Sequence, residues 1–209
     1  MSKISTLFPK KTKSFFKKFR KFNALNDLDK KLLKYINYNN GFYIECGAND
    51  GVDQSNTWYF EKFKNWRGIL IEAHPETYKE LKKNRSKKNI LINKFLVAKN
   101  YTSKTINISN NDLLSKISTS KEQSVSTQTM TLTEILKKNN SPKLIDLFSL
   151  DVEGYEFEVL KGIDFNSYKF RYFLIETNNF DKLNNYLIAK EYKFTDKFSN
   201  NDFLFSINE

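Results

Sequence analysis

The sequence predicts an α/β fold with a mostly parallel central sheet and helices on both of its faces. Short apolar runs that are typical of buried strands alternate along the chain with amphipathic stretches that are typical of helices. Glycines or acidic residues follow several of these runs directly, at the strand ends where sheets of this kind bind ligands. The length of 209 residues suffices for one such domain and a short appendage.

The expected elements follow one another in a regular order. A helix is expected over residues 26–38, where apolar residues recur at helical spacing, namely Leu28, Leu32, Leu33 and Ile36. Buried strands are expected at residues 42–46, 68–72, 90–97, 144–150 and 172–176. Further helices are expected at residues 57–64, 75–83, 155–161 and 180–189.

The last two strands, at residues 192–195 and 203–207, are expected to close the sheet as an antiparallel pair. Residues 100–130 interrupt the alternation, because they are rich in Ser, Thr and Asn and show only weak strand patterns at 105–108 and 125–129. This segment predicts an insertion near the carboxyl ends of the strands.

Residues 1–24 predict a basic amphipathic arm ahead of a single domain over residues 25–209. Residues 1–22 contribute +8 to the net charge of +11 and contain no acid. The phenylalanines that recur there at roughly helical spacing are Phe15, Phe16, Phe19 and Phe22. Such an arm can contact an anionic membrane or a partner protein, or its phenylalanines can dock on its own domain. Nucleic-acid binding has no support, because no recognised nucleic-acid module follows the arm.

Composition excludes several classes of protein. The single cysteine, Cys46, cannot form an intrachain disulfide, and together with His74, the one histidine, it cannot supply a structural zinc site. The sequence shows no apolar run long enough to span a membrane and no secretory pattern. We therefore expect a cytoplasmic protein, which is peripheral to a membrane if the basic arm binds one.

At residues 43–51 an apolar strand runs directly into a turn that contains two glycines, Gly47 and Gly51. Glycine lets the backbone approach a ligand closely and adopt positive φ, so this turn predicts a binding site. The spacing differs from Gly-x-Gly-x-x-Gly, and no Gly-Lys-Ser/Thr follows, so the turn is not a phosphate loop. The alternative is a tight strand-to-helix turn without a ligand.

Acidic residues end two other expected strands. Glu72 lies 21 residues after Gly51, where a carboxylate can accept hydrogen bonds from both ribose hydroxyls, or it is simply an exposed acid. Asp151 and Glu153 follow the strand at 144–150 and point to the same side of an extended backbone. Their mutual repulsion can raise one pKa, as is typical of a substrate site, or they cap the following helix.

Several segments together resemble the FkbM-type methyltransferases, which use S-adenosylmethionine and are usually O-methyltransferases. The main segments are YIECGANDG at 43–51, GILIEAHP at 68–75 and IDLFSLDVEGYE at 145–156. Leu-Lys-Gly at 160–162, Ile-Glu-Thr at 175–177 and a Thr-x-Thr-Leu run leading into a helix at 129–136 also fit. The resemblance covers roughly residues 41–180.

The resemblance implies a class I methyltransferase fold, which is Rossmann-like, with S-adenosylmethionine as the methyl donor. The cofactor-binding residues that it implies are Glu45, Gly47, Ala48, Asn49, Gly51, Glu72 and Ala73. Among them, Glu72 would hold the ribose hydroxyls and Ala73 would lie near the adenine. Position 45 is Glu where such folds often have Asp, and position 73 is Ala where Pro is frequent, but neither change removes a needed group.

The acceptor that the resemblance implies is a hydroxyl of a sugar, a glycan or a related small molecule. A hydroxyl is a poor nucleophile at neutral pH, so a general base or a metal should assist. Asp151 and Glu153 are the candidates for a catalytic base, and either could instead bind Mg²⁺ through its oxygens. His74 is expected to border the adenine, and Cys46 is expected to serve packing.

Three other functions compete with this interpretation. A nicotinamide-dependent oxidoreductase would share the fold, but the glycine spacing and the Asp-Val-Glu-Gly segment oppose it. A non-catalytic binding module could keep the fold and lack activity. An enzyme that methylates amino groups of nucleic-acid bases would carry an Asn/Asp-Pro-Pro-Tyr motif, which the sequence lacks.

Overall fold

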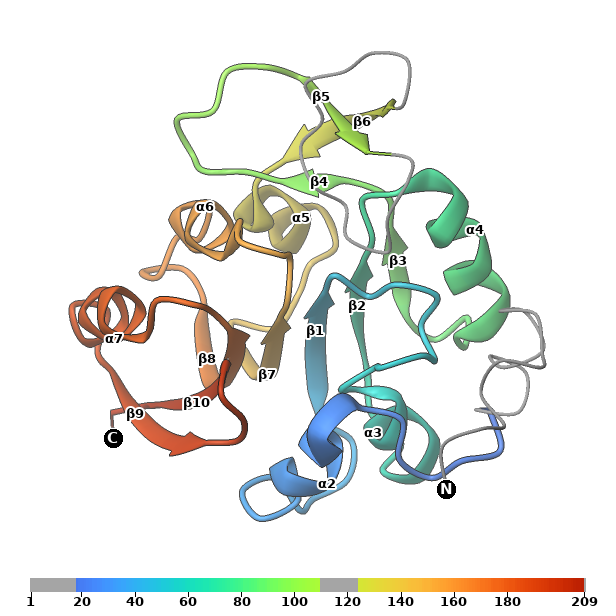
Figure 1. The fold of residues 1–209 in the computed structure, drawn as a ribbon, viewed down its shortest axis with the longest axis vertical. Helices are drawn as coiled ribbons and strands as arrows, with labels where there is room; N and C mark the ends of the chain where they lie inside the picture. The colour runs from blue at the N-terminus through green and yellow to red at the C-terminus, as the bar shows by residue number, and fades with distance from the viewer. Residues whose placement is uncertain (1–17, 110–123, 209) are drawn as a thin grey trace.

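The structure, a computed structural model, describes residues 18–109 and 124–208 and has the expected α/β architecture (Figure 1). Its seven-stranded central sheet has the order β3-β2-β1-β7-β8-β10-β9. These strands are β1 (Phe42–Cys46), β2 (Arg67–Ile71), β3 (Ile90–Ile92), β7 (Leu144–Leu150), β8 (Lys169–Glu176), β9 (Tyr192–Lys197) and β10 (Asp202–Ile207). The first five in the order pair in parallel, whereas β10 is antiparallel to both β8 and β9, which confirms the expected closing pair.

Helices cover both faces of the sheet. They are α2 (Leu28–Leu32), α3 (Trp58–Phe63), α4 (Pro75–Asn84), α5 (Leu132–Lys138), α6 (Glu156–Lys161) and α7 (Phe180–Ile188), with a 3-10 turn, η1 (Leu25–Asp27), before α2. No helix among the described residues is long and apolar enough to cross a membrane.

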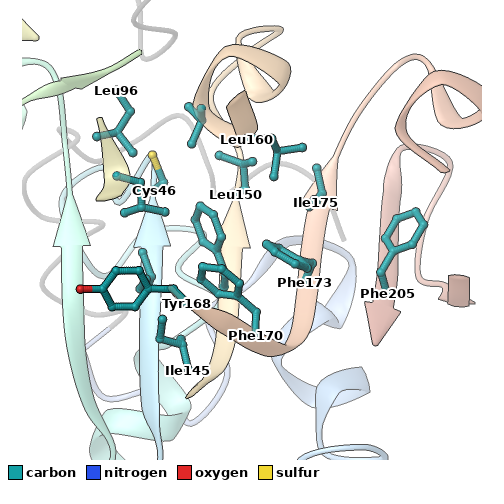
Figure 2. Packing of buried hydrophobic residues seen from close by; sticks show 14 of the residues in the cluster. Cys46, Leu96, Ile145, Leu150, Leu160, Tyr168, Phe170, Phe173, Ile175 and Phe205 are labelled. Carbon is teal, nitrogen blue, oxygen red and sulfur yellow. The ribbon is translucent and has the colours of Figure 1, made fainter. Parts of the chain in front are cut away.

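Alternating strand residues build a separate apolar core on each face. In β1, Ile44 and Cys46 join the core that α5, α6 and α7 cover, whereas Tyr43 joins the core under α2, α3 and α4. Figure 2 shows the first of these cores, in which Phe173 packs between the sheet and the helices. Burial on both faces explains why the strands are near-continuous apolar runs in the sequence.

The expected strand over residues 90–97 is corrected to two strands in different sheets. β3 ends at Ile92, and β4 (Phe95–Leu96) pairs with β6 (Ser124–Met130), which in turn pairs with β5 (Thr105–Ser109). The change of direction comes at Asn93, whose side-chain amide donates to the carbonyl oxygens of Glu72 and Ala73 at 2.8 and 2.9 Å. The small β4-β6-β5 sheet is the expected insertion, and it lies beyond the carboxyl ends of β1 and β2 (Figure 1).

The expected helix over residues 26–38 is corrected to the five residues of α2, although Leu28, Leu32 and Ile36 are buried as expected. Asn26 and Asp27 have positive φ values of 51° and 56°, so the helix cannot begin before Leu28. The buried carboxylate of Asp29 accepts the backbone N–H groups of Asn23 and Ala24 at 2.8 and 3.2 Å. It thereby folds the preceding segment back onto the domain.

Part of the basic arm docks on the domain. The Phe22 ring stacks on the Tyr59 ring of α3, with 4.8 Å between centroids, and the indole N–H of Trp58 donates to the Arg20 carbonyl. Phe15 and Phe16 lie outside the described residues. The expected docking of the arm's phenylalanines on the domain is therefore observed for Phe22.

A buried guanidinium, that of Arg85, joins the elements on the α3 side of the sheet. Its side chain is 0% exposed, and Nε lies 2.6 Å from Glu61 Oε2 of α3. Its remaining N–H groups donate to oxygens of Tyr43, Gly51, Ser55 and Thr57. Burial alone would raise the pKa of Glu61, but the positive charges of Arg85 and Lys62 outweigh it and lower this pKa to about 2.

Replacing Arg85 with Ala should lower the free energy of unfolding by about 3–5 kcal/mol, because Glu61 would remain as a buried charge without its main partner. Urea denaturation would measure the loss. The control is Lys83→Ala on the exposed side of α4, which should change stability by less than about 0.5 kcal/mol. Equal stability of the two variants would show that the Arg85 network does not hold these elements.

Candidate active site

A cavity lies at the carboxyl ends of β1, β2 and β7, the place predicted for a ligand in a parallel sheet. Five short stretches of chain line it. They contribute Cys46–Asn49, Asp53–Ser55, Ile71–Ala73, Lys94–Leu96, and a group comprising Asp151, Val152, Glu153, Tyr155 and Val159. We call this cavity the cleft.

Gly47 brings the ends of β1 and β7 into close approach. Its φ is +81°, and a Cβ atom at this position would lie only 1.8 Å from the backbone oxygen of Asp151. On the other side, the backbone N–H groups of Gly47 and Ala48 both donate to the Ile71 carbonyl, at 3.1 and 3.0 Å. The absence of a side chain at residue 47 therefore sets the spacing of three strand ends around the cleft.

Glu72 joins the end of β2 to the turn after β1. Its side chain is 5% exposed, and its two carboxylate oxygens accept the backbone N–H groups of Asn49 and His74 at 2.9 and 2.8 Å. These bonds fix the carboxylate at the wall of the cleft. Each carboxylate oxygen has a second lone pair, so Glu72 can accept further hydrogen bonds from hydroxyl groups of a ligand.

One wall of the cleft is apolar and aromatic. Ile71, Leu96 and Val159 line it, and the rings of Phe95 and Tyr155 meet at 5.0 Å with an angle of 65°. An apolar wall opposite a fixed carboxylate is the composition typical of a small-molecule site.

A row of carboxylates crosses the strand ends beside this wall. Glu176 at the end of β8 lies opposite Asp202 of β10, and Asp151 follows Leu150, whose partner in β8 is Ile175. Oxygens of Asp151, Glu153 and Glu176 all lie within 4.8 Å of one another. Like charges this close repel one another, so the arrangement must be held by the surrounding fold.

Asp151 is exposed as a whole residue, but partial desolvation of its carboxyl at the strand ends raises its pKa to about 9, and a hydrogen bond with Glu176 adds to this effect. The negative charges of Glu176, Glu153 and Asp202 act in the same direction. At neutral pH, Asp151 therefore keeps its proton. Oxygen ligands from three carboxylates could alternatively hold a divalent cation such as Mg²⁺.

The structure brings most of the predicted site residues together. Gly47, Ala48, Asn49, Glu72 and Ala73 line the cleft from the β1 and β2 side, and Asp151 and Glu153 line it from the β7 side. Cys46 lies at the inner end, and burial raises the pKa of its thiol well above the usual value, in agreement with its expected role in packing.

Two predicted residues lie outside the lining of the cleft. The Glu45 carboxylate is buried and accepts the Ser55 and Thr57 hydroxyls at 3.0 and 2.6 Å. Gly51 packs against α4, where a Cβ atom would lie 2.6 Å from Leu81 Cδ1. Both residues hold the turn that borders the cleft.

Several lining residues were not singled out by the sequence patterns, namely Asp53, Gln54, Ser55, Lys94, Phe95, Leu96, Val152, Tyr155 and Val159. Most come from loops whose course depends on tertiary contacts. Lys94 and Phe95 lie just after Ile92, the last residue of β3. Ligands bind at the carboxyl ends of strands, so both residues could have been predicted if the expected strand had ended at Ile92.

Residues 45–201 match the protein family described as the methyltransferase FkbM domain. No significantly similar sequence was found among curated proteins. Among solved structures, methyltransferase FkbM from Methylobacillus flagellatus is similar over 80% of this chain, with 14% identity and a TM-score of 0.53. This chain covers 43% of that protein, so it spans less than half of its length.

Two further solved structures are similar at lower TM-scores. The METTL16 MTase domain has 12% identity and a TM-score of 0.49 over 86% of this chain and 64% of its own. Precorrin-6y C5,15-methyltransferase from Geobacter metallireducens has 11% identity and a TM-score of 0.47 over 87% of this chain and 84% of its own. At such identities only the fold is shared, and it is the Rossmann-like class I methyltransferase fold.

Replacing Gly47 with Ala should destabilise the protein far more than replacing Gly154 with Ala. Both glycines have positive φ, which costs a side chain about 1–3 kcal/mol, but a Cβ atom at Gly154 meets nothing within 4 Å. The variant at Gly47 carries the additional clash with the Asp151 carbonyl. Thermal denaturation would compare the two, and equal shifts in melting temperature would contradict the close approach.

Replacing Asp151 with Asn should make stability less dependent on pH. With a pKa of about 9 in the folded protein against 3.8 as the ordinary value, the folded state binds more protons between these pH values. Stability of the native sequence therefore falls as pH rises through this window, and the loss is complete above about pH 9. We expect the Asn variant to gain stability relative to the native sequence as pH rises, measured by urea denaturation at a series of pH values. A constant difference would show that Asp151 takes up no proton on folding.

Proposed function

The chain belongs to the FkbM methyltransferase family, and on that premise we propose that it methylates a hydroxyl of a sugar, a glycan or a related small molecule with S-adenosylmethionine as donor. The observation that carries the proposal is the contact, at the wall of the cleft, between the turn after β1 and the Glu72 carboxylate after β2. There, the backbone N–H of Asn49 donates to Glu72 at 2.9 Å, beside the carboxylate row of β7 and β8.

The residues of the cleft fit this donor. Gly47 keeps the space between the strand ends free of a side chain, and Glu72 presents a fixed carboxylate to which ribose hydroxyls can donate. Ala73 and Leu96 offer an apolar surface for a purine. The negative charges of the Asp151 row favour a cationic donor in the cleft.

When bound, S-adenosylmethionine supplies a methyl group on a positively charged sulfur, which is an electrophile that needs little activation. The residues of this chain then have to orient the acceptor hydroxyl and receive its proton. Asp151 and Glu153 are the proposed bases, and Glu176 joins them because it is hydrogen-bonded to Asp151. Asp151 can accept a proton only after losing its own, so turnover should rise with pH as Asp151 ionises, toward about pH 9.

The test begins with binding of S-adenosylmethionine, measured by isothermal titration. Glu72→Gln should weaken binding by about ten- to a hundredfold, because the hydrogen bonds to a charged group contribute about 1.5–3 kcal/mol each. The control is Glu76→Gln in the first turn of α4, where the carboxylate is 71% exposed and pairs with Lys79. Equal affinity of the two variants would remove Glu72 from the donor site.

Turnover is measured by mass spectrometry with labelled donor and a panel of glycans and small hydroxyl compounds. Asp151→Asn and Glu153→Gln should lower kcat more than they weaken donor binding. Wild-type rates in both variants would show that neither is the base, and loss of turnover in EDTA would assign the carboxylates to a metal. Donor binding without transfer to any compound would favour a non-catalytic module.

A further inference from the structure

A stack of aromatic rings lies on the surface of α3 and the segment that precedes η1. The Phe22 ring stacks on Tyr59 at 4.8 Å, and Tyr59 stacks on Phe63 at 5.3 Å. The Lys21 ammonium lies 5.6–5.9 Å from the centroids of all three rings. These residues, with Phe19 and Lys62, form what we call the α3 surface.

Large apolar side chains are open to solvent at this surface. Phe19 is 76% exposed and Phe63 is 52% exposed, although phenylalanine is usually buried in a folded domain. Lys21 is exposed, and its ammonium lies over these rings at distances typical of a cation–π contact.

The charges around these rings are positive. Residues 18–24 contain Lys18, Arg20 and Lys21 and no acid, and residues 58–64 contain Lys62 and Lys64. Their one acid, Glu61, is 3% exposed and pairs with Arg85 in the interior and with Lys62. Residues 1–17, which precede this surface in the chain, add five lysines and no acid.

We propose that the α3 surface binds the anionic surface of a lipid bilayer. Exposed aromatic rings surrounded by lysines are the combination that holds peripheral proteins at the headgroup level, where the rings enter the interface and the cations attract acidic lipids. Phe19 and Phe63 enter the headgroup region, and Lys21 and Lys62 lie beside them. A single-stranded nucleic acid would need open ring faces for its bases, but Tyr59, on which both other rings stack, is only 6% exposed.

This surface is separate from the cleft. In Figure 1, α3 lies near the amino ends of β1 and β2, whereas the cleft lies at their carboxyl ends. Binding to a bilayer through α3 therefore leaves the cleft open. Variants of the α3 surface should bind S-adenosylmethionine as the native chain does, so failure of this proposal can be distinguished from failure of the proposed methyl transfer.

The test is sedimentation of the full chain with vesicles of phosphatidylcholine alone and of phosphatidylcholine mixed equally with phosphatidylserine. We expect binding only to the mixed vesicles, weakened by added NaCl. The double variant Arg20→Glu/Lys21→Glu should reduce the partition coefficient by about fivefold or more for each positive charge lost from the surface. Its matched control is Lys182→Glu/Lys193→Glu at α7 and β9, which changes the net charge equally and should bind nearly as well as the native chain.

The apolar contribution is tested separately with Phe63→Ser, whose control is Ile188→Ser, a replacement of an apolar residue that is 55% exposed on α7. We expect a severalfold loss for Phe63→Ser and no loss for the control. Equal losses in the paired variants, equal binding to both kinds of vesicle, or no binding would overturn the proposal. Binding of an oligonucleotide that depends on Arg20 and Lys21, without binding to vesicles, would assign the surface to nucleic acid instead.

Discussion

The buried guanidinium of Arg85 is the interaction on which one side of the molecule depends. It lies in the interior at the end of α4 and bonds to β1, to α3 and to the chain between them. It also lies 3.5 Å from the Glu45 carboxylate, which holds the 55–57 segment beside the cleft. The positive charge of Arg85 is tolerated in the interior because each N–H group of the guanidinium donates to an oxygen atom. The need for these acceptor oxygens fixes the turn that borders the cleft.

On the β7 side of the cleft, carboxylates that repel one another are held close together by the surrounding fold. Asp151, Glu176 and Asp202 lie at neighbouring strand ends, where like charges beside one another destabilise a sheet. Asp202 is partly compensated by the Ser199 hydroxyl, and Asp151 by keeping its proton. Such a departure from the most stable sequence is expected where a protein binds or transforms a ligand.

The fold could be predicted well from the sequence because patterns of neighbouring residues mark most of its strands and helices. Buried parallel strands are apolar throughout, and Pro75 begins α4 as its fixed φ favours. The cleft was predicted in part, because Gly47, Glu72 and Asp151 end strands that the pattern revealed. Glu45 and Gly51 were placed at the ligand by resemblance, but their contacts depend on Arg85, which lies 34 residues beyond Gly51 in the chain. The helix at residues 26–38 was overestimated at both ends: Asn26 and Asp27 have positive φ, and the N–H groups of residues 33–35 donate to carbonyls three residues back, in tight turns that end the α-helix.

The small β4-β6-β5 sheet lies beyond the strand ends and forms no ladder with the seven central strands in the described part of the chain. Its Phe95 and Leu96 nevertheless line the cleft. Replacement of the small sheet by another segment would thus change the part of the cleft that Phe95 and Leu96 line. The central sheet and the Glu72 carboxylate after β2 would stay in place. The ligand preference of the cleft can in this way diverge by replacement of one peripheral unit, without redesign of the folding core.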